Sequence, residues 1–202
     1  MIVITNPFSI ENETNIIQSL FTEGLPLLHI RKPDFSELEM AKFIHQIKLD
    51  FRDRIVLHNH HALAEDFGIN RFHFSEKERK QSHDSPARFS KPCRYSTSTH
   101  SIKDFNSLGS DFDYAFLSPV FKSISKENYH PKEDLFEEIK SRTNYKTKVI
   151  ALGGIDSQNI QKVLQNGFDD IALLGGIWNH ENPLKQFKLC QQIVLSHLQS
   201  QV

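Results

Sequence analysis

The stretch from residue 148 to residue 178, KVIALGGIDSQNIQKVLQNGFDDIALLGGIW, constrains the fold more than any other part of the chain. Two apolar runs, at residues 149–152 and 171–174, flank a segment whose apolar residues recur at helical spacing. Two buried strands joined by one helix must lie parallel, because a short turn cannot return the chain to the same end of a sheet. The stretch therefore predicts a strand–helix–strand unit of a parallel sheet.

A pair of glycines follows each apolar run, Gly153 and Gly154 after the first and Gly175 and Gly176 after the second. In parallel strands both pairs lie at the carboxyl ends, where backbone amides without a neighbouring Cβ can approach a phosphate. Tight turns are the alternative interpretation of the glycines. Two pairs at equivalent ends of adjacent strands favour an anion site.

The same alternation of strand-like and helix-like segments continues along the whole chain. Further strands are expected at residues 2–5, 27–31, 55–57, 72–74, 93–96 and 114–117, and helices at 16–21, 35–51, 63–67, 102–108, 135–139, 156–165 and 183–199. Residues 77–91 are predicted to form a loop with a partial helix. Eight strand–helix alternations predict one (β/α)8 TIM barrel, a single domain over residues 1–202, with a doubly wound sheet as the alternative.

Length, charge and cysteine content narrow the function classes. The 202 residues suffice for one domain and lie at the lower limit for such a barrel. A net charge of -1 gives no broad basic surface, so neither nucleic acid nor an anionic membrane is an expected partner. No window approaches the roughly 20 apolar residues of a membrane span, and the N-terminus does not resemble a signal peptide. Cys93 and Cys190 lack metal spacing, which fits free thiols in a reducing cytoplasm.

Polar residues gather where the predicted strands end, which is where βα barrels place their active sites. The candidates are His29, Arg31, His58, Asn59, His73, Glu76, Glu78, Ser98, His100, Ser123, Ser125 and Lys126, together with the four glycines. This set offers cations, hydroxyls and backbone amides but few carboxylates, which suits a phosphate or diphosphate ligand. Ordinary surface polarity would explain any one of these residues alone, whereas their common placement favours a site.

These motifs carry a resemblance to a known family. The sequence resembles the thiamine phosphate synthases and their relatives, the TenI-like thiazole tautomerases, over essentially the whole chain. The matching motifs are HIRKP, HNHHALA followed by GINRFHFSE, STSTHS, DYAFLSPVFKSISK, VIALGGI with a following Asn159, and ALLGGIW. The resemblance implies a phosphate-binding barrel and a transferase of thiamine biosynthesis. Such an enzyme joins hydroxymethylpyrimidine diphosphate to a thiazole phosphate, releases pyrophosphate and uses Mg²⁺.

The resemblance also implies roles for particular residues. The family's Gln-x-Arg-x-Lys motif after strand two corresponds to His29, Arg31 and Pro33, so the arginine is kept and the lysine is absent, although Lys32 is adjacent. The serine after strand five corresponds to Ser98. The catalytic residues implied are therefore Arg31, Ser98 and Lys126, with Arg31 and Lys126 holding the departing diphosphate.

The remaining substrate contacts implied by the resemblance lie on four other motifs. They are His29 and His58, Asn59, the hydroxyl pair Ser123 and Ser125, and the glycines Gly153, Gly154, Gly175 and Gly176, which would hold the thiazole phosphate. The expected partners are these small phosphorylated substrates, and a homo-oligomer is left open.

The magnesium ligands depart from the family pattern. The family's Asn-Asp after strand three corresponds to His58 and Asn59, so one metal carboxylate is lost. The second ligand corresponds to Glu78, which is still an oxygen donor. Because Asn59 offers a carbonyl oxygen without charge, we expect a weakened affinity for Mg²⁺.

Three alternative functions stay open at this stage. A thiazole tautomerase needs only acid–base chemistry; its family histidine follows strand six, where this chain has Pro119, but His29, His58, His73 or His100 could take that role. A non-catalytic binder of thiazole phosphate or thiamine phosphate would keep the glycines and lose the metal site. Another phosphate-binding barrel, an epimerase or an aldolase, would use Lys126 as a Schiff-base lysine.

Overall fold

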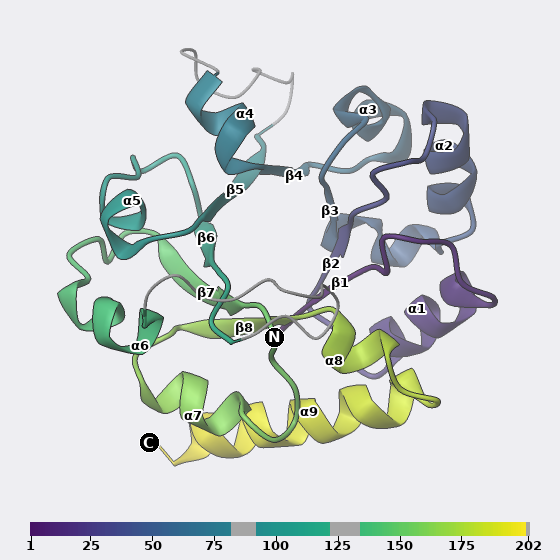
Figure 1. Ribbon diagram of the computed structural model, residues 1–202. Helices are drawn as coiled ribbons and strands as arrows, with labels where there is room; N and C mark the ends of the chain where they lie inside the picture. Colours follow the sequence, from purple (N-terminus) through teal and green to yellow (C-terminus); the bar gives the residue numbers. More distant parts are fainter. Residues whose placement is uncertain (82–91, 122–133, 201–202) are drawn as a thin grey trace.

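The computed structural model describes residues 1–81, 92–121 and 134–200, and within them eight parallel strands close into a barrel (Figure 1). Each strand pairs with the next along the chain, and β8 pairs with β1. The strands are β1 (Ile2–Ile4), β2 (Leu27–Ile30), β3 (Ile55–Leu57), β4 (Arg71–Phe74), β5 (Arg94–Thr99), β6 (Tyr114–Leu117), β7 (Lys148–Leu152) and β8 (Asp170–Leu173). The predicted (β/α)8 barrel is confirmed, and closure of β8 on β1 excludes the doubly wound sheet.

Helices surround the barrel and follow the strands in the chain (Figure 1). They are α1 (Glu13–Thr22), α2 (Glu37–His45), α3 (Ala64–Phe67), α4 (Glu76–Gln81), α5 (Ile102–Asn106), α6 (Leu135–Glu138), α7 (Ile160–Gln165), α8 (Gly175–Trp178) and α9 (Pro183–Gln199), with short 3₁₀ helices at Leu49–Arg54, His61–Leu63 and Ile139–Ser141. None of these described helices is long and apolar enough to cross a membrane.

Two predicted helices are shorter than the periodicity indicated. The segment 35–51 divides into α2 and a 3₁₀ helix, because Lys48, between the two, has an extended backbone conformation. The helix predicted from residue 156 begins only at Ile160. There the Asp156 carboxylate accepts from the amide of Gln158, and the Asn159 side chain accepts from the amide of Asp156. These local hydrogen bonds hold residues 156–159 in a turn outside the helix.

Strand β5 is longer than predicted, because its polar side chains are satisfied by neighbouring strands. The Thr97 hydroxyl donates to the carbonyl of Phe74 at 2.8 Å, and the Thr99 hydroxyl donates to the carbonyl of Phe116 at 2.9 Å. Buried hydroxyls are tolerated when such bonds are made. The STST sequence therefore forms a central strand despite its low hydropathy.

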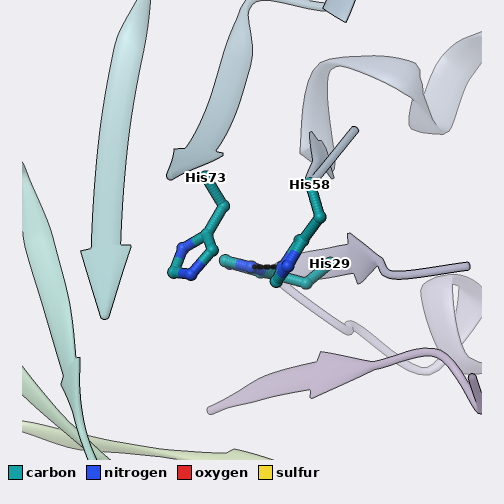
Figure 2. Close-up of side chains that lie close together, drawn as sticks. All are labelled: His29, His58 and His73. Carbon is teal, nitrogen blue, oxygen red and sulfur yellow. Dashed lines mark hydrogen bonds between the residues drawn. The ribbon is translucent and has the colours of Figure 1, made fainter. Parts of the chain in front are cut away.

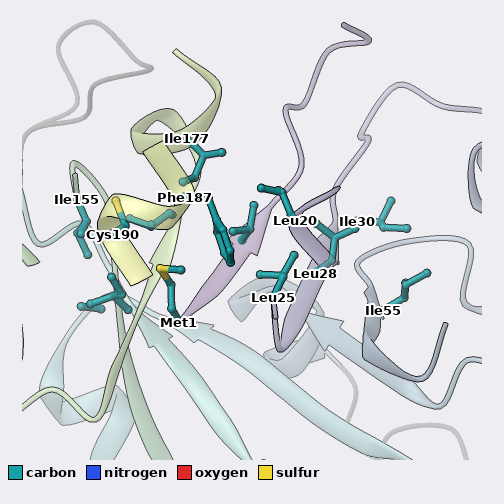
Figure 3. Close-up of a cluster of buried hydrophobic side chains, with 14 of the residues drawn as sticks. Met1, Leu20, Leu25, Leu28, Ile30, Ile55, Ile155, Ile177, Phe187 and Cys190 are labelled. Atoms are coloured by element: carbon teal, nitrogen blue, oxygen red, sulfur yellow. The ribbon is translucent and has the colours of Figure 1, made fainter. Parts of the chain in front are cut away.

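Outward-facing strand residues build the core between the barrel and its helices. Leu28 and Ile30 of β2 pack in one cluster with Leu20 of α1 and Phe187 of α9, and all four are fully buried (Figure 3). Burial of such side chains contributes about 1.5–3 kcal/mol each. This layer fixes the strands, and hence the positions of the residues that follow them.

The barrel interior is apolar on one side and polar on the other. Its apolar side contains Ile2, Ile4, Phe116, Ile150 and Ala172 in one cluster with Tyr114. The adjoining strands β2, β4 and β5 instead direct buried polar side chains inward, namely His29, His73 and Ser96. A polar half inside a barrel core is costly unless its groups are hydrogen-bonded.

Candidate active site

A cavity of about 660 Å³ opens at the carboxyl ends of the strands. Its polar lining consists of Arg31, His58, His73, Ser75, Glu76, Lys77, Lys80, Ser98, His100, Ser118 and the glycines 153, 154, 175 and 176. Apolar side chains, among them Ile4, Phe116 and Leu152, form the rest of the wall. The cavity thus combines several cationic groups with one described carboxylate, Glu76, which suits an anionic ligand.

The two glycine pairs lie together on this cavity, as the sequence predicted for adjacent strand ends. Gly153 and Gly154 adopt φ values of 103° and 66°, in the left-handed region that favours glycine. A Cβ on Gly153 would lie 2.9 Å from Cα of Pro119, and one on Gly176 would overlap the carbonyl oxygen of Ile155. Gly175 and Gly176 form the first residues of α8, where the sequence indicated only a turn.

Three histidines meet at the floor of the cavity (Figure 2). His29 Nδ1 lies 2.8 Å from His58 Nε2, and His29 Nε2 lies 2.6 Å from the hydroxyl of Tyr114. The rings of His58 and His73 stack with centroids 4.2 Å apart. His29 and His73 are buried, whereas His58 is half-buried. The ends of β2, β3 and β4 thereby bring together residues separated by up to 44 positions in the chain.

Two serines of β5 contact both ring nitrogens of His73. His73 Nδ1 and Nε2 each lie 2.9 Å from a hydroxyl, that of Ser96 and that of Ser98 respectively. The Ser96 hydroxyl also lies 3.3 Å from the carbonyl oxygen of Phe72, to which it donates. Ser96 then accepts from Nδ1–H of His73, and Nε2 is left with the lone pair that Ser98 faces.

Burial keeps all three imidazoles neutral. It lowers the pKa of His29 and of His58 well below the usual value, with a smaller contribution from the proximity of His73. Burial also lowers the pKa of His73 to about 3, helped by the nearby His61 and Arg31. A cation in this poorly solvated floor would lose most of its hydration. At neutral pH the floor therefore presents nitrogen lone pairs and N–H donors without charge.

A second polar group lies on the α4 side of the cavity. The Glu76 carboxylate pairs with Lys80 one turn later, and it lies 3.5 Å from Nε2 of His100. The bond to Lys80 lowers the pKa of Glu76. His100 Nδ1 in turn contacts the carbonyl oxygen of Ser118 at 2.7 Å. The negative charge of the Glu76 carboxylate is therefore already balanced by the ammonium group of Lys80.

The predicted site residues fall into three groups. Lining the cavity are Arg31, His58, His73, Glu76, Ser98, His100, Gly153, Gly154, Gly175 and Gly176. Of the other described candidates, His29 is buried behind His58, while Asn59 and Glu78 lie outside the lining. Ser123, Ser125 and Lys126 lie outside the described residues.

The two oxygen ligands that the family resemblance implies for magnesium lie outside the cavity lining. Glu78 Oε2 accepts hydrogen bonds from the amide and the hydroxyl of Ser75, and so caps α4. Asn59 donates through Nδ2 to the carbonyl of Lys32, and its Oδ1 is a buried neutral acceptor with no hydrogen-bond partner among the described residues. Mg²⁺ requires several hard oxygen ligands in octahedral geometry. One amide oxygen and one capping carboxylate do not complete such a shell alone, so the magnesium site stays a prediction.

Lys32 does not replace the lysine that the family motif places at residue 33. Its Nζ lies 2.5 Å from Oε2 of Glu13 and 2.9 Å from the carbonyl oxygen of Phe8, and its side chain is fully buried. The ammonium also lies over the rings of Phe35 and Phe43. Proximity in sequence suggested a substitute, but residues 31 and 32 point to opposite sides of the strand end.

The sequence did not indicate the partners of the histidines. His73 is among the strand-end candidates, whereas Tyr114 and Ser96 are not. Strand alternation carried the missing signal, because β5 and β6 pair Ser96 with Tyr114 and Ser98 with Phe116. In β6 these inward positions alternate with the outward apolar residues Ala115 and Leu117, and in β5 they alternate with outward threonines.

The fold and the cavity together define a class of protein, a (β/α)8 barrel with a polar cavity where barrel enzymes bind their substrates. A family model described as thiamine monophosphate synthase matches residues 1–177. The chain belongs to this family, which confirms the resemblance noted in the sequence.

Individual relatives carry related names at low identity. A thiamine-phosphate synthase of Prochlorococcus marinus (strain AS9601) is 34% identical over 88 residues, a match that covers 43% of this chain but only 24%, about a quarter, of that relative's length. A thiamine-phosphate synthase of Caldicellulosiruptor saccharolyticus is 21% identical over 188 residues, covering 89% of this chain and 82% of the relative. The solved structure of thiamine phosphate pyrophosphorylase from Bacteroides thetaiotaomicron is 29% identical, with a TM-score of 0.76 and 96% of each chain covered.

Proposed function

We propose that this chain is a thiamine phosphate synthase, a transferase that joins hydroxymethylpyrimidine diphosphate to a thiazole phosphate and releases pyrophosphate. One observation carries the proposal: in a member of this family, Arg31, Ser98 and both glycine pairs line a single cavity at the strand ends. We further propose that residues 1–202 act as one domain.

The proposed reaction is a substitution at the pyrimidine methylene carbon. The bond from this carbon to the diphosphate oxygen breaks, and its electron pair leaves with the diphosphate. The lone pair of the thiazole nitrogen forms the new carbon–nitrogen bond. That nitrogen carries no proton to remove, so positioning and charge neutralisation supply the catalysis and a strict general base is unnecessary.

Arg31 would neutralise the departing diphosphate, because it is a cationic residue of the cavity wall. The amides of Gly153, Gly154 and the α8 pair would bind the thiazole phosphate. Ser98, which already contacts His73 Nε2, would donate its hydroxyl to a substrate oxygen or nitrogen. The roles proposed for Ser123, Ser125 and Lys126, contacts to the phosphate groups, rest on the sequence resemblance alone.

Replacement of Arg31 by alanine tests the proposed clamp. We expect kcat/KM for thiamine phosphate formation to fall by about 100-fold or more, as for loss of one well-placed charge-stabilising group. Arg94→Ala is the matched control. Arg94 begins β5 at the opposite end of the barrel, where it lies 3.9 Å from Asp113, and its loss should leave the rate unchanged. Full activity of Arg31→Ala would remove this residue from the mechanism.

A thiazole tautomerase is the second candidate, because three imidazoles, those of His58, His73 and His100, line the same cavity. The lowered pKa values of His58 and His73 oppose a role for these two, since a general acid or base works best with a pKa near the working pH. Incubation with thiazole phosphate alone separates the two functions. Interconversion of thiazole isomers without the pyrimidine substrate supports a tautomerase, whereas binding without any conversion or coupling supports a non-catalytic binder.

A further inference from the structure

The histidine floor of the cavity has the composition of a metal site of a kind other than magnesium. One ring nitrogen from each of His29, His58 and His73 lies within 4.8 Å of the other two. Figure 2 shows the three rings approaching one another from three different strand ends. Among the described residues, these three histidines are the one set of three or more histidine, cysteine or carboxylate side chains that lie close enough to share an ion.

We propose that His29, His58 and His73 bind a divalent transition-metal ion of the Zn²⁺ class through three imidazole nitrogens. Imidazole suits zinc, cobalt, nickel and copper, whereas Mg²⁺ and Ca²⁺ select oxygen donors. Three protein nitrogens leave the fourth position of a tetrahedral ion open. Because His58 and His73 both line the cavity, that position faces the cavity, where a water molecule or a phosphate oxygen can occupy it.

The surrounding hydrogen bonds match what metal-binding histidines require. A ligating histidine usually donates its second ring N–H to a nearby polar group, which fixes the tautomer and the orientation of the ring. His29 has Tyr114 at Nε2, so its Nδ1 can carry the lone pair. His73 has Ser96 at Nδ1, so its Nε2 can carry the lone pair. The hydrogen bonds of two of the three ligands are therefore compatible with the tautomer that binding needs.

The protonation state of the three histidines also suits a metal, because imidazole must be neutral to bind one.

A small rearrangement of the side chains would complete the site. Nitrogens on a tetrahedral ion with bonds of about 2.0–2.1 Å lie about 3.3 Å apart, whereas His29 Nδ1 and His58 Nε2 are 2.8 Å apart. The half-buried ring of His58 would move slightly away from His29 to open this separation. The ring of His73 would turn so that Nε2 leaves the Ser98 hydroxyl and faces the ion.

Cobalt provides the direct test, because Co²⁺ replaces Zn²⁺ and absorbs visible light according to its coordination. Metal-free, untagged protein titrated with CoCl₂ should bind one ion per chain and develop the intense visible bands of a four-coordinate site. Zn²⁺ should abolish these bands, and excess Mg²⁺ should leave them unchanged. His29→Gln and His73→Asn should lose the bands, and Tyr114→Phe should bind about 10–100-fold more weakly because its hydrogen bond to His29 is gone.

His45→Gln is the matched control, since His45 is exposed on α2. It should keep both the bands and the affinity. Bands that persist in His29→Gln and His73→Asn, or an absence of tight binding in the wild-type protein, would overturn the proposal and leave the cluster as hydrogen-bonded core. If the variants do not fold, X-ray absorption of the zinc-loaded wild type decides. Three imidazole nitrogens around zinc support the site, and a shell of oxygen ligands contradicts it. The inference does not depend on the proposed synthase activity.

Discussion

At the scale of single residues, Gly176 illustrates how backbone packing can require a glycine beside an active site. Its place at the start of α8 brings it against the carbonyl of Ile155, where an added Cβ would overlap the oxygen atom. The sequence showed that two glycine pairs end adjacent strands. It did not show which glycines serve packing, because the contact joins residues 155 and 176 across two strand ends.

Gly176→Ala should destabilise the protein by about 1–3 kcal/mol, since the backbone must shift to relieve the overlap. Urea unfolding at neutral pH measures the change. Gly109→Ala is the control, because nothing lies within 4 Å of a Cβ placed there. Equal stability of the two variants would contradict the packing assigned to Gly176.

Lys32 provides a second residue-scale prediction, because it pairs with Glu13 away from solvent. Lys32→Met should cost about 3–5 kcal/mol by leaving a buried carboxylate without its partner. The double variant Lys32→Met with Glu13→Leu should recover most of this loss. Thermal or urea unfolding of the single and double variants measures both effects. A Lys32→Met variant as stable as the wild type would show that the ion pair between Lys32 and Glu13 is not formed in solution.

At the scale of secondary-structure elements, the ends of β2, β3 and β4 form one polar unit from three separate segments. The strands were predictable from their apolar runs, and His29, His58 and His73 were recognisable as strand-end residues. Their mutual contacts were not, because ring orientation depends on register and on the inward neighbours Tyr114 and Ser96. The later start of α7 was missed because local hydrogen bonds outweighed the apolar periodicity, and the earlier end of α2 was missed because the backbone is extended at Lys48.

This polar unit predicts a characteristic loss of stability in acid for the metal-free protein. An unfolded histidine has a pKa of about 6.5, whereas burial lowers that of folded His73 to about 3. Between these values the unfolded chain binds more protons, so stability falls as the pH falls, by about 1.4 kcal/mol per pH unit for each histidine held neutral.

Urea unfolding at pH 7 and at pH 5, with EDTA present, measures this slope. His73→Asn keeps polar contacts to the serines but removes one titrating group, so its stability should depend less steeply on pH. His45→Gln, on the exposed face of α2, should behave as the wild type. A His73→Asn variant with the wild-type slope would contradict the neutral state assigned to this histidine.

At the scale of the whole molecule, repetition made the barrel predictable. Each apolar run was followed by a helical segment, and eight such units have few ways to bury their strands other than closure of β8 on β1. The position of the cavity was predictable for the same reason, since ten of the candidate residues at the strand ends line it. The metal ligands were less predictable. Asn59 and Glu78 stay predicted ligands by their position in the sequence, and the structure shows Glu78 capping α4 through Oε2 and Asn59 donating to the Lys32 carbonyl.

Formation of thiamine phosphate tests the central claim most directly. Purified protein would be incubated with hydroxymethylpyrimidine diphosphate and thiazole phosphate, with Mg²⁺, with Zn²⁺ and with EDTA in parallel. Thiamine phosphate and pyrophosphate would be quantified by mass spectrometry and a coupled phosphate assay. We predict that both products appear in equal amounts, and that Arg31→Ala forms neither at a comparable rate. Binding of thiazole phosphate without either product under all three conditions would contradict the synthase account.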